Sequence, residues 1–156
     1  MKNFSKVAVI VCLALALVLC AVACQPDMPS KGEVTIVIAP LEGEATEYTV
    51  DLSDIAEDGG VMAILDYLQT NKGLKYTSED RGYGAYLTKV GVLEEKPEAG
   101  EFIYLYTSVA KDFNVSEYAS TVEYQGKTLT DSGVGVSSMS VEDGAIIYIT
   151  IIKFNY

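Results

Sequence analysis

The sequence predicts an α+β domain, and the order of two periodic patterns carries that prediction. Alternating apolar and polar residues occur near residues 33–52 and return after residue 83. Between these stretches, from Val61 to Leu68, the apolar residues fall at helical spacing. A strand pair, one helix and then several strands is typical of a sheet with a helix packed on one face.

The first strand pair and the helix have the clearest signals. Residues 33–39, EVTIVIA, alternate and are β-branched, and residues 48–52 predict a partner strand across a turn at Gly43. The helix follows Gly59 and Gly60 and ends where Asn71-Lys72-Gly73 supplies a stop. We expect its apolar face, which consists of Val61, Ile64, Leu65 and Leu68, to be buried against the sheet.

The remaining strands are predicted from the second half of the chain. Residues 83–90 alternate, and residues 122–124 and 127–129 flank Gln125-Gly126, a pair suited to a tight hairpin. Residues 102–107 and 145–152 are apolar on both faces, so they predict strands in the interior of a sheet. Residues 110–120 show no regular pattern.

The N-terminus has the layout of a secretory signal. Lys2 and Lys6 precede 18 uncharged, mostly apolar residues from Val7 to Cys24, VAVIVCLALALVLCAVAC. Residues 1–23 therefore predict a signal peptide. An uncleaved membrane anchor is the competing interpretation, because 18 apolar residues just reach the length that spans a bilayer.

Cys24 is the predicted site of lipid attachment. Ala21-Val22-Ala23-Cys24 resembles the bacterial lipobox, although that motif usually has Leu where Ala21 stands. Cleavage before Cys24 would remove Cys12 and Cys20, which leaves no disulfide for the mature chain. Residues 24–32, rich in proline and polar side chains, predict a lipid-attached tether. The expected location is extracytoplasmic, lipid-anchored to the membrane at a bacterial cell surface.

The mature chain is strongly acidic. It keeps all 22 Asp and Glu residues and loses two of 11 basic residues, which gives 9 − 22 = −13. Such a charge repels nucleic acid and anionic lipid, so the sequence disfavours both as partners.

Four landmarks stand in the order of a known family. They are residues 58–68 around the helix, residues 82–90 (GYGAYLTKV), residues 100–106 (GEFIYLY) and residues 141–147 (VEDGAII). In this order they resemble the transcobalamin-like C-terminal domain of bacterial surface lipoproteins, over residues 33–156. The family's third landmark usually has Tyr-Trp where Phe102 and Ile103 stand, and Asn-Gly where Thr107 and Ser108 stand.

The resemblance implies a fold and a class of ligand. The fold is a β-grasp-like mixed sheet crossed by one packed α-helix. In vitamin carriers of the family this domain is half of a cobalamin clamp, and the other half is a large helical domain that this chain lacks. The resemblance therefore implies a corrinoid such as cobalamin, or another bulky cofactor, as ligand.

The residue types present disfavour catalysis. The chain has no histidine, and the mature part has no cysteine besides the lipidated one, so the commonest bases and nucleophiles are missing. No spacing typical of a metal site occurs either. The sequence predicts a non-catalytic protein with no bound metal.

Tyrosine provides the candidate ligand site. The chain has 11 Tyr and no Trp, and Phe102, Tyr104 and Tyr106 alternate onto one face of their strand. Tyr83 and Tyr86, on the preceding strand, point to opposite faces, and whichever shares this face would extend the surface; Tyr86 is included in the candidate site. The rings suit stacking on a planar or amphipathic ligand. The opposite face, with Ile103 and Leu105, is expected under the helix. The alternative is that the rings are ordinary core or cross-strand pairs.

Two functions of different classes remain. The first is a non-catalytic ligand-binding module, which predicts a concave aromatic surface. The second is a cell-envelope protein–protein interaction module that pairs through a sheet edge, which predicts an exposed edge strand.

Overall fold

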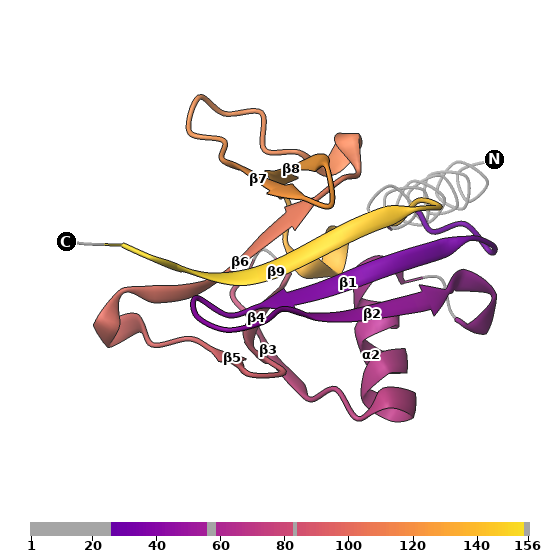
Figure 1. The fold of residues 1–156 in the computed structure, drawn as a ribbon, viewed down its shortest axis with the longest axis horizontal. Coiled ribbons are helices and arrows are strands. Elements are labelled where there is room, and N and C mark those ends of the chain that lie inside the picture. Colours follow the sequence, from indigo (N-terminus) through magenta and orange to yellow (C-terminus); the bar gives the residue numbers. More distant parts are fainter. Residues whose placement is uncertain (1–25, 56–58, 83, 155–156) are drawn as a thin grey trace, which may run out of the picture.

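The computed structural model describes residues 26–55, 59–82 and 84–154, and it confirms the α+β class. The six strands of the larger sheet are β1 (Glu33–Ala39), β2 (Thr46–Asp51), β6 (Glu101–Thr107), β7 (Thr121–Tyr124), β8 (Lys127–Asp131) and β9 (Ala145–Lys153). The three strands of the smaller sheet are β3 (Tyr76–Asp80), β4 (Ala85–Val90) and β5 (Leu93–Glu94). The helix α2 (Gly60–Lys72) and short 3₁₀ turns complete the described chain (Figure 1).

The larger sheet has the order β2-β1-β9-β6-β8-β7. Only the β1–β9 pair is parallel, with Val34 opposite Ala145, so the sheet is mixed. The last strand, β9, lies between β1 and β6, and it is buried on both faces along most of its length. The prediction that residues 102–107 and 145–152, which are apolar on both faces, form interior strands of a sheet is therefore confirmed.

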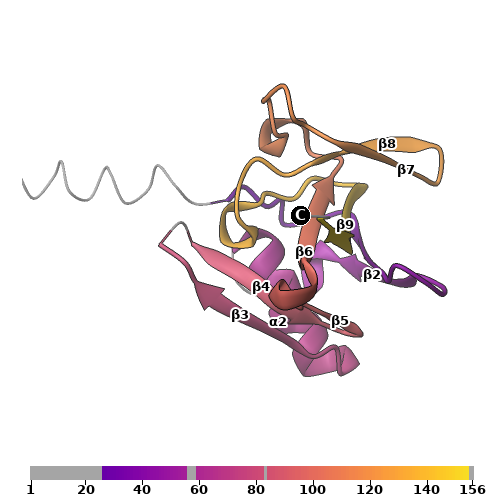
Figure 2. The same ribbon diagram turned by 90° about the vertical axis from the view of Figure 1, so that its left-hand side faces the viewer.

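The helix α2 packs on one face of the larger sheet. Val61, Ile64, Leu65 and Leu68 are each 0% exposed, as their helical spacing predicts. The helix ends at Gly73, whose left-handed backbone (φ 72°) lets its N–H donate to the Leu68 carbonyl. The smaller sheet covers the rest of this face, and Figure 2 shows both α2 and the strands β3 and β4 on one side of β6 and β9.

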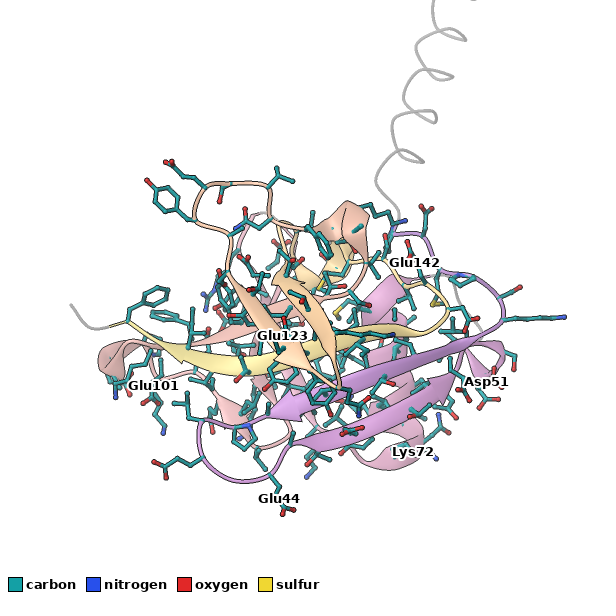
Figure 3. All side chains as sticks on the ribbon, turned by 45° about the horizontal axis from the view of Figure 1, so that its top comes forward. Glu44, Asp51, Lys72, Glu101, Glu123 and Glu142 are labelled. Atoms are coloured by element: carbon teal, nitrogen blue, oxygen red, sulfur yellow. The ribbon has the colours of Figure 1, made fainter. Side chains whose placement is uncertain are left out.

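The β7–β8 hairpin pairs only with the end of β6 and folds back over the opposite face of the larger sheet, where it covers a second core cluster. Its turn has positive φ at Gln125 (49°) and Gly126 (75°), as the predicted two-residue hairpin requires. The hairpin crosses over the sheet, and Figure 3 shows it, with Glu123 labelled, in front of β9. Its tip reaches β2, where the Tyr124 hydroxyl donates to Glu47. A second core cluster forms beneath it, from Val37, Tyr106, Leu129 and Ile146.

Short 3₁₀ turns connect the strands, at η1 (Leu52–Asp54), η2 (Pro97–Ala99), η3 (Ala110–Asp112) and η4 (Val136–Ser138). The irregular pattern of residues 110–120 is confirmed, because η3 leads there into a loop. The predicted signal peptide, Cys24, and Tyr83 lie outside the described residues. Across residues 26–55, 59–82 and 84–154, no helix has the length and apolar character needed to cross a membrane.

Candidate functional site

A cleft of about 150 Å³ lies between the two sheets. Its walls are residues 85–87 of β4, residues 103–105 of β6 and the loop that leads to η4, through Ser132, Val134, Gly135 and Val136. The two strands contribute consecutive residues, so the cleft runs along their edges and receives side chains from both faces of each strand. Most of its surface is apolar.

Among the described residues no backbone pairing joins β4 to β6, and side chains from Tyr86, Glu95 and Ser137 connect the walls of the cleft. The Tyr86 hydroxyl lies 3.4 Å from the Ile103 carbonyl oxygen, and the Ala85 N–H donates to Ser137 Oγ of η4 at 3.0 Å. The Ile103 N–H donates to Glu95 Oε1 at 3.2 Å. These longer connections separate the two strands by more than the spacing within a sheet and leave room between them.

Tyr86 is fixed in one wall of the cleft by charged neighbours. Its hydroxyl donates to Glu95, and the guanidinium of Arg81, the single arginine of the chain, lies 4.0 Å from the ring centroid. Arg81 also pairs with Glu95 at 3.2 Å, and the Glu95 side chain is only 4% exposed. Burial, and then the hydrogen bond to Glu95, raise the pKa of Tyr86, so its hydroxyl stays protonated and its ring stays in place.

Tyr104 is fixed in the other wall. Its hydroxyl donates to Asp131 Oδ2 at 2.8 Å, and its ring meets Tyr106 edge to face with 5.4 Å between centroids. Burial, followed by the bond to Asp131, raises the pKa of Tyr104. Since the hydroxyls of Tyr86 and Tyr104 both donate to carboxylates, neither hydroxyl hydrogen is left to donate to a ligand.

The structure divides the four predicted ligand-binding residues into two groups. Tyr86 and Tyr104 line the same cleft, although they belong to different sheets. Tyr106 is 8% exposed and lies in the core cluster under the hairpin, so its ring has little surface for a ligand. Phe102 lies near the start of β6, where its ring packs against that of Phe154 with 5.9 Å between the centroids. Ile103 and Leu105 join the core on the helix side, as their alternation predicts.

Two residues of the site have no clear signal in the sequence. Glu95 falls in a stretch of polar residues that reads as an exposed turn, and only the fold shows its burial between β4 and β6. Val134, which is 38% exposed at the rim of the cleft, falls in a glycine-containing loop without periodicity.

The chemistry of the cleft is that of contact and orientation. Ser132 Oγ is occupied in its own loop, where it donates to the Val134 carbonyl at 2.8 Å and accepts from the Val134 N–H at 3.2 Å. Nowhere in the described ranges do three or more Asp, Glu or Cys residues gather in a way that could hold a metal ion. The arrangement suits an apolar group or one edge of a larger ligand that enters a mostly apolar cleft.

Comparison with known proteins supports the fold. No family model and no curated protein matches the sequence. Among solved structures, a candidate metal-binding protein from Ruminococcus gnavus ATCC 29149 aligns at a TM-score of 0.52 and 10% identity, over 80% of this chain and 100% of that one.

Haptocorrin in complex with Cbi (cobinamide) aligns at a TM-score of 0.53 and 14% identity, over 80% of this chain. This chain spans only 26% of the haptocorrin chain. At these identities the alignments show the fold and nothing finer. Since haptocorrin is a member of the transcobalamin family, the fold of this chain is transcobalamin-like.

Proposed function

We propose that the protein is a membrane-anchored extracytoplasmic lipoprotein that acts as a non-catalytic ligand-binding module. The observation that supports this most directly is the apolar cleft between the two sheets, which Tyr86 of one sheet and Tyr104 of the other both line. The cobinamide-bound haptocorrin structure makes a corrinoid the leading ligand among bulky cofactors.

The size of the cleft decides how such a ligand would bind. A volume of about 150 Å³ corresponds to about five water molecules, so it admits one edge or one substituent of a macrocycle. The rest of the ligand would lie across the rim at Val134. The matched region is about a quarter of haptocorrin, so we expect a further domain or protein to cover the outer side of the ligand.

Calorimetric titration of the protein with cobinamide and cobalamin tests the proposal. Val134→Asp places a charge at the apolar rim and should weaken binding about tenfold or more, because the carboxylate would lose water without gaining a partner. Val92→Asp is the matched control, since Val92 is 75% exposed in the β4–β5 turn and does not line the cleft. No heat with either corrinoid, or equal weakening by both variants, would contradict the proposal.

A cell-envelope protein–protein interaction module is the second candidate. It is favoured by β2 and β3, which each lie at the end of their sheet and so have one backbone edge without a neighbouring strand. A photo-crosslinker placed at Thr49 in β2 or at Thr77 in β3 should then capture one envelope protein in intact cells. Crosslinking to many proteins at similar yield would speak against this function.

A further inference from the structure

The loop of residues 114–120, between η3 and β7, presents two apolar side chains to solvent. Val115 is 96% exposed and Tyr118 is 82% exposed, the highest values among the exposed large hydrophobic residues of the described chain. Single exposed apolar residues are ordinary on protein surfaces. Two of them on one projecting loop need a second observation before they indicate a partner, and the structure provides two.

The first observation is that the loop is held in shape. Both of its ends are tied to Asp131, whose carboxylate accepts from Asn114 Nδ2 at 2.9 Å and from the Ser120 N–H at 2.7 Å. Within the loop, the Ser116 N–H donates to Asn114 Oδ1 at 2.9 Å, and the Ala119 N–H donates to the Ser116 carbonyl at 3.1 Å. The two apolar side chains are thus displayed by an ordered backbone, and little entropy is lost when they are bound.

The second observation is the place where the described chain begins. The Asp27 carbonyl accepts from the Val141 N–H at 2.8 Å, and the Asp27 N–H donates to Ser140 Oγ at 3.1 Å. The Asp27 carboxylate also pairs with Lys111 of η3, the turn that leads into the loop. In Figure 3 the loop and the beginning of the coloured ribbon lie on the same, upper side of the molecule, as does Glu142.

These contacts determine which side of the domain a lipid on Cys24 would hold toward the membrane. Cys24 precedes Pro26 by two residues, which span at most about 7 Å when extended. Because Asp27 is already bound to the body, the chain after the lipid is too short to let the domain turn away. With a lipid on Cys24, the side of the molecule that carries η3 and the 114–120 loop would therefore face the bilayer.

We propose that the 114–120 loop is a second membrane contact, in which Val115 and Tyr118 enter the headgroup region of a phospholipid bilayer beside the lipid anchor. This inference rests on the proposed lipidation of Cys24. Tyrosine is enriched at membrane interfaces, where its amphipathic ring lies at the level of the headgroups. Because the acidic charge of the domain disfavours anionic lipid, the proposed contact is with zwitterionic headgroups, among which Glu117, the one charged residue of the loop, can remain.

The contact is too small to bind a membrane alone. The lipid holds the loop at high effective concentration near the surface, so even a weak contact orients the domain. A test must therefore measure insertion of the loop in the anchored protein, and binding of the free domain to vesicles is not informative.

The absence of tryptophan makes a direct test available. Full-length Tyr118→Trp is expressed, purified from membranes and reconstituted in phosphatidylcholine vesicles with brominated acyl chains, with mass spectrometry to detect the lipid on Cys24. We expect a blue-shifted emission and about a twofold loss of intensity from the bromine quencher. Leu41→Trp is the matched control, because Leu41 is 57% exposed in the β1–β2 turn. Figure 3 shows Glu44, a residue of the same turn, on the lower side of the molecule, away from the loop.

Val115→Glu in the Tyr118→Trp background gives a second measurement, and it should restore most of the intensity. A lipidated protein in which the Tyr118→Trp and Leu41→Trp indoles are quenched equally, or not at all, overturns the membrane contact and leaves the anchor intact. A protein without lipid on Cys24 overturns both. Quenching that Val115→Glu leaves unchanged also contradicts the proposal, because the apolar loop would then not be the inserted element.

Discussion

Asp112 and Asp131 are both buried, at 5% and 1% exposed, and they differ in what surrounds the carboxylate. Asp131 accepts from Tyr104, Asn114 and the Ser120 backbone, so its charge is met by donors from three directions. Asp112 accepts from the Ser140 N–H at 2.6 Å, and burial raises its pKa above the ordinary value of 3.8. The ionised form of Asp112 is therefore disfavoured in the folded protein.

The raised pKa of Asp112 predicts a pH dependence of stability. From pH 3.8 up to its raised folded value, the native state holds more protons at this site than the unfolded state does, so the free energy of unfolding falls as pH rises. Asp112→Asn should remove this contribution, because the amide is uncharged and its oxygen can still accept from Ser140. Urea unfolding at several values between about pH 4 and 6 should then show a shallower decline for the variant. Glu98→Gln, an exposed change in η2, is the control, and parallel curves for Asp112→Asn and the wild type would contradict the prediction.

At the scale of the elements, α2 and the β7–β8 hairpin cover opposite faces of the larger sheet, and each depends on a short sequence signal. The helix has its apolar stripe and a glycine stop, and the hairpin has Gln125-Gly126. These signals are local, so the sequence predicts both elements well. The strand β3 was not predicted, because its exposed residues 77–80 are polar throughout and show no alternation.

Leu65→Ala tests the buried face of α2. Leu65 is 0% exposed within the main core, so the change should cost about 2–5 kcal/mol of stability through the lost contacts and the cavity left behind. Gln69→Glu, one turn later on the exposed face, should be nearly silent, because the carboxylate can still accept from the Tyr76 N–H. Urea midpoints that move equally for the two variants would mean that the helical face is wrong.

Gly73→Ala tests the end of the same helix. The left-handed backbone at Gly73 is strained for any residue with a Cβ, while the space around it is open, with nothing within 4 Å of an added Cβ. The cost should therefore come from the backbone alone, at about 1 kcal/mol. Thermal unfolding can measure it, and a stabilised variant would contradict the assigned cap.

For the molecule as a whole, the sequence predicts the elements but not how the two sheets meet. Strand alternation predicts that Ile103 and Leu105 point to one face of β6 and that Tyr104 and Tyr106 point to the other. The structure confirms this, because the two pairs join different core clusters. The pairing of Tyr86 with Tyr104 across one cleft does not follow, because strand periodicity gives the face of a residue and not the distance between sheets. Nor does the burial of Glu95, whose exposed neighbour Glu94 has the same side chain.

The junction of the sheets gives a prediction at this scale. Glu95→Ala would leave the Ile103 N–H, the Tyr86 hydroxyl and Arg81 without their shared acceptor, at a cost of about 3 kcal/mol. Glu95→Gln keeps one acceptor oxygen and should cost less. Hydrogen exchange at the Ile103 amide should accelerate most in Glu95→Ala. Unchanged exchange there, with normal stability, would show that Glu95 does not hold β4 to β6.

The central position of β9 has a consequence for how the chain folds during its synthesis, and for its export if the proposed signal peptide directs it. Since β1 has its parallel partner only in β9, with residue 34 beside residue 145, a ribosome must finish nearly the whole chain before the middle of the sheet can assemble. Long-range pairing of this kind is slow to form. A nascent chain led by a secretory signal would therefore reach its export machinery still unfolded, which is the state that threading through a translocation channel requires.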